Sequence, residues 1–404
     1  MKWEKVKLGD IATCIQPGPF GSQLHNSDYS KEGTPIIMPK DIVGGAIVHS
    51  GLLKVSEEHV KRLSRHQVYE GNLMVARKGD VRKCAYITAN ENGWMTGSDC
   101  LKVVLDESKC YPKFIYYQLR SEHIGRWLEK VSIGATMPSL NTGLLSGIEM
   151  VLPPIEIQKQ IAGILSVYDD LIENNQKQIK LLEEAARRLY KEWFVDLRFP
   201  GHENTKIVDG VPEGWSVYPF SSKVDIMSGG TPKTSIPDYY NGKIPFYTPK
   251  DSDGAFFAYK TQINITEGGL KNCNSRLYPP KTVIITARGT VGKTTILAVP
   301  MAMNQSCYAL KMKENDAPYY LFFALNNEIK ALQTMANGGV FNTIIGKTFD
   351  SINIQIPKDP LIYGFEKTVR PFMEQIKNKL QANSKLVEAR DRLLPKLMSG
   401  EVKV

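Results

Sequence analysis

The chain has 404 residues, 42% of them hydrophobic and 23% charged, with a formal net charge of +9. That length allows two or more domains with their own cores. The sequence contains no apolar run of about 18 residues that would span a membrane. It also begins without an apolar signal core, and its six cysteines form no CxxC pair, so we expect a cytoplasmic protein with reduced thiols. The positive charge permits a polyanionic partner without establishing one.

Residues 1–153 are predicted to form a compact α+β domain. Short β-branched and aromatic runs, such as residues 34–38 and 71–76, alternate with glycine, proline and asparagine and are typical of strands joined by turns. A helix is expected over residues 112–130, where apolar residues recur at helical spacing.

Residues 154–199 have a different pattern. Glycine and proline almost vanish, and apolar residues recur at alternating spacings of four and three, which is typical of a heptad seam. A helix of about 38 residues would be about 57 Å long, longer than a domain of this size is wide, so we expect it to project from its domain. The predicted seam consists of Ile161, Leu165, Ile172, Asn175, Ile179, Leu182 and Leu189.

The rest of the chain repeats this plan. Residues 200–214 contain Pro-Gly and Pro-Glu-Gly and are predicted to be a linker. Residues 215–357 are predicted to form a second α+β domain, with a strand at 282–286 and a helix at 318–336. Residues 358–404 are predicted to form a second long helix, in which Lys379 and Arg390 interrupt the seam. That seam consists of Val369, Ile376, Asn383, Leu386 and Leu393.

The two halves are a tandem duplication of one large unit. Pro39-Lys40-Asp41 recurs 210 residues later as Pro249-Lys250-Asp251, and residues 182–189 match residues 386–393. Two equivalent copies predict a pseudo-twofold relation, and under that relation the two long helices must run antiparallel. The fold class is therefore predicted to be α+β, with two globular domains separated by an antiparallel pair of long helices. Asn175 lies at a core position of this pair, where a buried polar side chain can define the register, and Lys379 or Asn383 is its expected neighbour.

One stretch suggests a nucleotide-binding site. Residues 287–294 follow a predicted strand and nearly match GxxxxGK[ST], but Ala287 replaces the first glycine. The equivalent residues 76–84 lack the motif, so a basic turn shared by both copies explains the pattern better. A P-loop ATPase remains one alternative, and a coiled-coil scaffold that binds only proteins is another. The sequence contains no HExxH, no GxSxG and no paired Cys/His spacing, and we predict no catalytic or metal site.

A binding surface on matching loops is the remaining hypothesis. Asparagine and glutamine can bind adenine with two hydrogen bonds, and arginine and lysine bind guanine or phosphate. The two copies differ most in these loops, as expected if each domain recognises a different short sequence; a solvated loop is the alternative. The candidate DNA-binding residues are Lys40, Arg77, Lys78, Arg82, Lys83 and Asn141 in the first half, and Lys250, Arg288, Lys293, Gln305, Asn342 and Thr343 in the second.

Three segments carry a family resemblance. They are Leu-Pro-Pro-Ile-Glu-Ile-Gln-Lys-Gln-Ile-Ala at 152–162, Glu-Trp-Phe-Val-Asp-Leu-Arg-Phe-Pro at 192–200, and Pro-Glu-Gly-Trp at 212–215. With the duplication, they make the whole chain resemble the specificity (S) subunits of type I restriction–modification systems. The second junction departs from the pattern, because residues 356–360 lack the glutamine of the first.

The resemblance implies a domain plan and a set of partners. Residues 1–153 and 215–357 would be target recognition domains, 154–199 and 358–404 the two conserved helical regions, and 200–214 the linker. Such subunits bind double-stranded DNA at a bipartite asymmetric site, with one half-site for each domain. They assemble with two modification subunits, which carry S-adenosylmethionine and methylate adenine, and with restriction subunits, which use ATP and magnesium. The S subunit itself would be non-catalytic and bind no cofactor.

Overall fold

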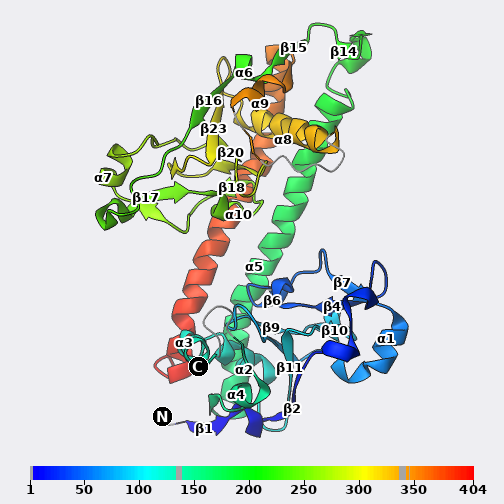
Figure 1. Ribbon diagram of the computed structural model, residues 1–404, viewed down its shortest axis with the longest axis vertical. Helices are drawn as coiled ribbons and strands as arrows, with labels where there is room; N and C mark the ends of the chain where they lie inside the picture. The colour runs from blue at the N-terminus through cyan, green and yellow to red at the C-terminus, as the bar shows by residue number, and fades with distance from the viewer. Residues whose placement is uncertain (1–2, 133–138, 336–342, 345) are drawn as a thin grey trace. The chain divides into compact units, whose positions relative to one another are not determined.

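The computed structural model describes residues 3–132, 139–335, 343–344 and 346–404. The chain divides into two compact units (Figure 1). Unit 1 comprises residues 1–172 and 385–404, and unit 2 comprises residues 173–384. Each long helix contributes to both units, so the units do not follow the order of the chain.

Unit 1 is built on a four-stranded antiparallel sheet in the order β2-β11-β8-β9. A second sheet, β10-β4-β7-β3, includes a parallel pair between β4 and β10. Two further pairs are β1-β12 and β5-β6. The strands are β1 (Glu4–Lys7), β2 (Ala12–Pro17), β3 (Tyr29–Ser30), β4 (Thr34–Ile37), β5 (Ile42–Val43), β6 (Ala46–Ile47), β7 (Leu53–Val55), β8 (Leu73–Ala76), β9 (Cys84–Tyr86), β10 (Met95–Thr96), β11 (Cys100–Leu105) and β12 (Glu149–Leu152).

The helices of unit 1 cover this framework. They are α1 (Glu57–Arg62), α2 (Pro112–Leu119), α3 (Glu122–Val131) and α4 (Thr142–Ser146), joined by the first part of α5 (Ile155–Tyr190) and the last part of α10 (Asp359–Ser399). The single helix expected over 112–130 is in fact two. Ser121 accepts a hydrogen bond from the Ile124 N–H and so begins α3 as its N-cap, which ends the preceding helix.

Unit 2 repeats the plan, with a five-stranded sheet β16-β23-β20-β21-β18, a three-stranded sheet β19-β17-β22, and the pairs β15-β24 and β13-β14. The strands are β13 (Ile207–Val208), β14 (Val211–Pro212), β15 (Ser216–Pro219), β16 (Val224–Ser228), β17 (Tyr240–Tyr247), β18 (Phe257–Ala258), β19 (Asn264–Ile265), β20 (Val283–Thr286), β21 (Thr294–Leu297), β22 (Ala302–Met303), β23 (Cys307–Met312) and β24 (Asn353–Ile356). The helices are α6 (Phe220–Lys223), α7 (Glu267–Lys271), α8 (Pro318–Met335) and α9 (Gly346–Asp350), with the remaining parts of α5 and α10.

The predicted linker contains a hairpin. Strands β13 and β14 pair through Asp209 and Gly210, both of which have positive φ (51° and 78°). An Asp-Gly pair in this conformation matches the right-handed twist of the flanking strands. The Asp-Gly dipeptide is the local signal for this turn, although we predicted only a linker here.

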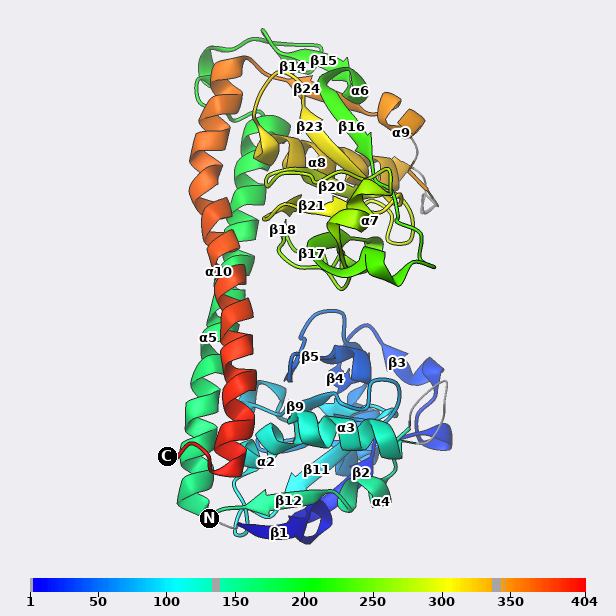
Figure 2. The same cartoon turned by 90° about the vertical axis from the view of Figure 1, so that its left-hand side faces the viewer.

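The two long helices pack antiparallel within each unit, as predicted. In unit 1, Ile161 and Leu165 early in α5 share a core with Leu394 and Leu397 late in α10. In unit 2, residues late in α5 share a core with residues early in α10: Ile179, Ala186 and Tyr190 with Phe365, Val369 and Ile376. Within each unit the two segments lie side by side in both views (Figures 1 and 2). All twelve predicted seam residues are buried or half-buried.

Two polar contacts fit this pairing. In unit 2, the Asn175 side-chain amide donates to the Asn383 Oδ1 at 2.8 Å, so Asn383, rather than Lys379, is the polar partner. In unit 1, Arg390 was expected to interrupt the seam, but it is only 7% exposed and donates to Asp169 at 2.5 Å. Tyr117 donates its hydroxyl to the same carboxylate at 2.7 Å. A buried arginine with these partners belongs to the seam, which corrects the expectation.

Unit 2 holds the end of α5 by aromatic packing. After Tyr190 the chain makes a π-helical turn, Lys191–Val195, that buries Phe194. The Phe194 ring lies 5.0 Å from Tyr320 and 5.1 Å from Phe365, measured between centroids. Arg198 then binds both carboxylate oxygens of Glu192 at 2.5 and 2.6 Å. These contacts give the Glu-Trp-Phe…Arg pattern a physical reason. Phe194 packs the end of α5 against the core of unit 2, and the Glu192–Arg198 ion pair spans the turn that follows.

In each unit, a buried side chain of a long helix accepts hydrogen bonds from backbone N–H groups at the start of a shorter helix, α2 in unit 1 and α8 in unit 2. Gln158 accepts the Tyr111 N–H at 2.9 Å and donates to the Pro153 carbonyl at 2.8 Å. Glu366 accepts the N–H groups of Tyr319 and Tyr320 at 2.9 and 2.8 Å. The second junction therefore has an equivalent of the glutamine after all, 208 residues later, the same separation as Asn175 and Asn383. Residues 356–360 do not show this equivalent, because the side chain that corresponds to Gln158 is Glu366, which lies further along the chain.

The first prediction concerns the asparagine pair. Asn175→Leu removes the hydrogen bond to Asn383 and should lower the free energy of unfolding by about 1 kcal/mol, because the seam loses one hydrogen bond between the two helices. The double variant Asn175→Leu/Asn383→Leu should recover or exceed wild-type stability, because two apolar residues then face each other. Denaturant unfolding of the wild type and the two variants measures this. Equal stability of the single and double variants would contradict it.

The second prediction concerns pH. Burial raises the pKa of Glu366 from 4.5 to about 7, although the two N–H donors act in the opposite direction. The unfolded chain therefore loses this proton first, and the stability of unit 2 should fall by about 3 kcal/mol as pH rises from 4.5 to above 7. Glu366→Gln should remove this loss, and Gln158→Glu should introduce a similar one in unit 1. Thermal melting from pH 5 to 8 tests both, and parallel curves for wild type and Glu366→Gln would refute the assignment.

Candidate nucleic-acid interface

Three turns meet at one end of the sheets in each unit. In unit 1 they are residues 39–41, 77–83 and 97–99; in unit 2 they are residues 249–251, 287–293 and 304–306. We call each set a turn cluster. The first and third turns follow the paired parallel strands β4 and β10, or β17 and β22, so they leave the sheet on the same side. Matching loops far apart in the sequence are thereby brought together, as a binding surface requires.

Backbone hydrogen bonds bind the turns to one another. In unit 1, the Arg77 N–H donates to the Asp99 carbonyl at 2.7 Å, and the Arg77 carbonyl accepts the Leu140 N–H at 2.8 Å. In unit 2, the Ala287 N–H donates to the Ser306 carbonyl at 2.7 Å, and the Ala287 carbonyl accepts the Ile344 N–H at 2.9 Å. Arg77 is therefore the structural equivalent of Ala287, and Lys78 that of Arg288.

Three of the four candidate cations in the basic turn of unit 1 contact acceptors in the protein. Lys78 forms an ion pair with Asp99 at 3.0 Å. Lys83 donates to the Pro39 carbonyl at 3.0 Å and so connects the basic turn to the first turn. Arg82 pairs with Glu122 and with Glu129 of α3, which makes it the weakest DNA-binding candidate of the four.

The remaining candidate cation, Arg77, is half-buried and lies over an aromatic ring. Its guanidinium carbon is 5.5 Å from the centroid of Phe20. Lys40, in the first turn, is exposed. Asn141 has a structural role, because its side-chain oxygen accepts the Leu144 N–H at 2.8 Å and caps α4. The structure therefore leaves Lys40 and Arg77 as the best-placed donors of unit 1.

In unit 2, the candidates Lys250, Arg288, Lys293 and Gln305 are all exposed. The Thr290 hydroxyl donates to the Pro249 carbonyl at 3.2 Å, the same connection that Lys83 makes in unit 1. Thr343 is half-buried and immediately precedes Ile344, whose N–H donates to the carbonyl of Ala287 in the basic turn. Asn342 lies outside the described residues. The scaffold is the same in both units, whereas the side chains that it presents differ.

Each cluster has a fourth element that we did not predict, a loop that crosses the third turn. We call residues 18–23 and 229–233 the crossing loops. A Cβ on Gly18 would lie 2.0 Å from the Gly97 carbonyl oxygen, and one on Gly229 would lie 2.2 Å from that of Asn304. Only glycine fits such an approach. The glycine that follows β2 in one half and β16 in the other is the signal in the sequence for these loops.

The P-loop alternative conflicts with the topology. Gly292, Lys293 and Thr294 lie at the end of a turn between antiparallel strands β20 and β21, where a P-loop requires a helix. Thr294 is a buried strand residue whose hydroxyl donates to the Asn326 side chain at 2.9 Å. Its hydroxyl is therefore not placed to bind magnesium.

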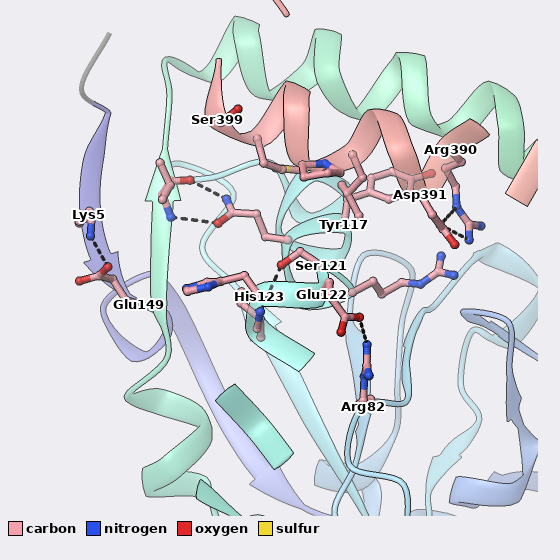
Figure 3. Close-up of a pocket in the computed structure, with 17 residues that line it drawn as sticks. Lys5, Arg82, Tyr117, Ser121, Glu122, His123, Glu149, Arg390, Asp391 and Ser399 are labelled. Carbon is pink, nitrogen blue, oxygen red and sulfur yellow. Dashed lines mark hydrogen bonds and ion pairs between the residues drawn. The ribbon is translucent and has the colours of Figure 1, made fainter. Parts of the chain in front are cut away.

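A separate groove of about 510 Å³ lies in unit 1 between α2, α3, β12 and the last turns of α10 (Figure 3). Its charged side chains form ion pairs: Lys5 with Glu149 at 2.6 Å, Arg390 with Asp391 at 2.8 Å, and Arg82 with Glu122. The equivalent groove of unit 2 is only about 170 Å³, and Phe194 and Tyr320 are among its lining residues. Because its cations are paired, we do not include this groove in the interface.

No group of three or more histidine, cysteine, aspartate or glutamate side chains is arranged to hold a metal ion within the described ranges. The same part of the chain also contains no helix that is long and apolar enough to cross a membrane. These findings leave the two turn clusters as the candidate site.

Comparison with known proteins agrees with this architecture. The family described as the type I restriction modification DNA specificity domain matches residues 1–184 and 212–383. The chain belongs to this family. The match falls separately on the two halves, as the duplication predicts, and the resemblance to specificity subunits of type I systems is confirmed.

Relatives in this family cover the full chain. The specificity subunit of the type I restriction enzyme MjaIX from Methanocaldococcus jannaschii is 26% identical over 100% of this chain and 94% of its own length. The specificity subunit of HindI from Haemophilus influenzae is 22% identical over 99% of each chain. A crystal structure of the type I S subunit from M. genitalium, 18% identical, covers 98% of this chain and 96% of its own, with a TM-score of 0.58, and it shows the same fold.

The third prediction concerns the exposed cations of unit 2. Replacing Lys250, Arg288 and Lys293 with alanine should weaken DNA binding and reduce its dependence on salt. The slope of log K against log salt concentration should fall by about 0.9 for each lost phosphate contact. Lys109→Ala, in the loop between β11 and α2 of unit 1 and outside both turn clusters, is the control. An unchanged salt slope in the triple variant would exclude these residues from the interface.

Proposed function

We propose that this chain is the DNA-reading subunit of a type I restriction–modification complex, and that each unit reads one half of a bipartite asymmetric site through its turn cluster. The chain would bring two modification subunits, which carry S-adenosylmethionine and methylate adenine, to that site. Restriction subunits that use ATP and magnesium would complete the nuclease. The chain itself would supply recognition and spacing and bind no cofactor.

One observation carries the proposal. The two turn clusters have the same backbone hydrogen bonds at Arg77 and Ala287, yet they present different side chains to solvent. A shared scaffold with divergent donors suits two domains that recognise different short sequences. Membership of the family and a net charge of +9 support the same function.

Methylome sequencing tests the function directly. A host that expresses this chain together with a type I modification subunit should acquire adenine methylation at a single motif composed of two different half-sites separated by an unread spacer. A host that expresses the modification subunit alone should lack it. A purely structural scaffold would leave the methylome unchanged in both, and that outcome would overturn the proposal.

The fourth prediction concerns the spacer. We propose that the paired long helices set the distance between the half-sites. Four residues inserted near Gln178 in α5, with four matched residues near Leu380 in α10, would lengthen both helices by about 6 Å and add about one helical turn. Since B-DNA rises about 3.4 Å per base pair, the preferred spacer should grow by one or two base pairs, with both half-sites unchanged.

The insertion must be matched because the two helices pack against each other on both sides of the insertion point. Asn175 pairs with Asn383, and Asp169 pairs with Arg390. Both pairs lie on the same side of the insertion, so inserting four residues in α5 alone would leave them intact and would move Ile179 and Tyr190 out of register with Ile376 and Phe365. That variant should be destabilised, which makes it a useful control. Spacer length is read from the methylated motif of each variant. An active matched variant with an unchanged spacer would show that the helices do not set the distance.

A further inference from the structure

Three equivalent positions of the turn clusters carry different side chains in the two units. One lies on the crossing loop, one in the basic turn and one in the third turn. In unit 1 they are Phe20, Arg77 and Ser98; in unit 2 they are Thr231, Ala287 and Gln305. The equivalence follows from the close approaches of Gly18 and Gly229 and from the backbone bonds of Arg77 and Ala287. Each unit thus has one long hydrogen-bonding side chain among these positions, but it comes from a different turn.

Arg77 differs from its neighbours in how it is held. Both its N–H and its carbonyl are hydrogen-bonded, so its Cα is fixed by the scaffold. Its guanidinium lies over the ring of Phe20, which is itself 54% exposed. Within the described part of the chain, no carboxylate forms an ion pair with Arg77, whereas Lys78 and Arg82 both have carboxylate partners.

A ring contact leaves the donors of an arginine available. Lying over an aromatic face stabilises the cation without using any of its five N–H groups, and it orients the planar fork. An exposed aromatic side chain next to such an arginine has no packing role in the protein core. The pair therefore has the features of a preorganised donor that lacks its acceptor.

In unit 2 the long polar side chain lies on the third turn rather than in the basic turn. Ala287 is buried and has no side-chain donor. Gln305, exposed on the third turn, accepts a hydrogen bond from the hydroxyl of Thr231 on the crossing loop. In both units, then, the crossing loop contacts the long polar side chain. In unit 1 the crossing loop contacts an arginine through an aromatic ring, and in unit 2 it contacts a glutamine through a hydrogen bond.

We propose that Arg77 selects a guanine in the half-site read by unit 1, and that Phe20 is the positioning residue that orients its guanidinium. This rests on the proposed function. Arginine donates two hydrogen bonds to the O6 and N7 acceptors of guanine in the major groove, a pattern that no other base presents. Lysine at this position would keep the charge but lose the planar fork.

The experiment is selection of duplexes from a random library by the complex of this chain with a modification subunit, followed by sequencing. Arg77→Lys should reduce the preference for guanine at one position of one half-site by about 10-fold to 100-fold. Phe20→Ala should reduce it in the same direction, and Phe20→Tyr, which keeps the ring, should retain it. Lys109→Ala, in the same unit, should change nothing.

The other half-site is an internal control for folding, because preferences there should be unchanged in every variant. If Arg77→Lys leaves all preferences intact, or changes both half-sites equally, the assignment of Arg77 is overturned. If Phe20→Ala keeps the guanine preference, the positioning role is overturned. A wild-type complex that selects no bipartite site would instead refute the proposed function, so the two failures are distinguishable.

Discussion

The backbone at Arg77 and Ala287 is the constraint on which the candidate interface depends. One residue in each basic turn donates to the third turn and accepts from a segment about 60 residues further along the chain, as the Arg77–Asp99 and Arg77–Leu140 bonds show. Because these are main-chain bonds, they do not depend on which side chains the turns carry. The scaffold can therefore carry different side chains at equivalent positions, and a duplicated chain can acquire two specificities without changing its fold.

The long helices are subject to a different constraint. Apolar seam residues alone would allow an antiparallel pair to slip by a turn, because leucine and isoleucine pack tolerably in several registers. Asn175 with Asn383, and Arg390 with Asp169, form hydrogen bonds between the helices that break if the helices shift. Burying polar groups is costly unless they are paired, so the observed register is favoured over its neighbours. A fixed register also suits the spacing role that we propose, because it fixes how far the two paired helices extend past each other.

The two turn clusters carry polar side chains on a backbone that hydrogen bonds hold in place. The residues there include cations, carboxylates, amides and hydroxyls, with Lys78 paired to Asp99, and the basic turn of unit 2 is part of a β-hairpin. Burial strongly alters the pKa values of buried tyrosines and cysteines, of His66 and of Glu366, and Glu366 serves a helix terminus. The arrangement suits recognition, because the turns at one end of the sheets hold hydrogen-bond donors at fixed positions.

Much of this architecture follows from local sequence. The duplication, the strands at 34–37 and 283–286, the helix from 318, the heptad seams and the antiparallel pairing depend on periodicity and repetition, which the chain itself displays. The tertiary structure decided what depends on contacts between distant residues. The partner of Asn175, the burial of Arg390, the equivalence of Glu366 with Gln158 and the contact of Phe20 with Arg77 all join segments far apart in the chain. No periodicity records such contacts, because they arise only when the sheets and helices have packed.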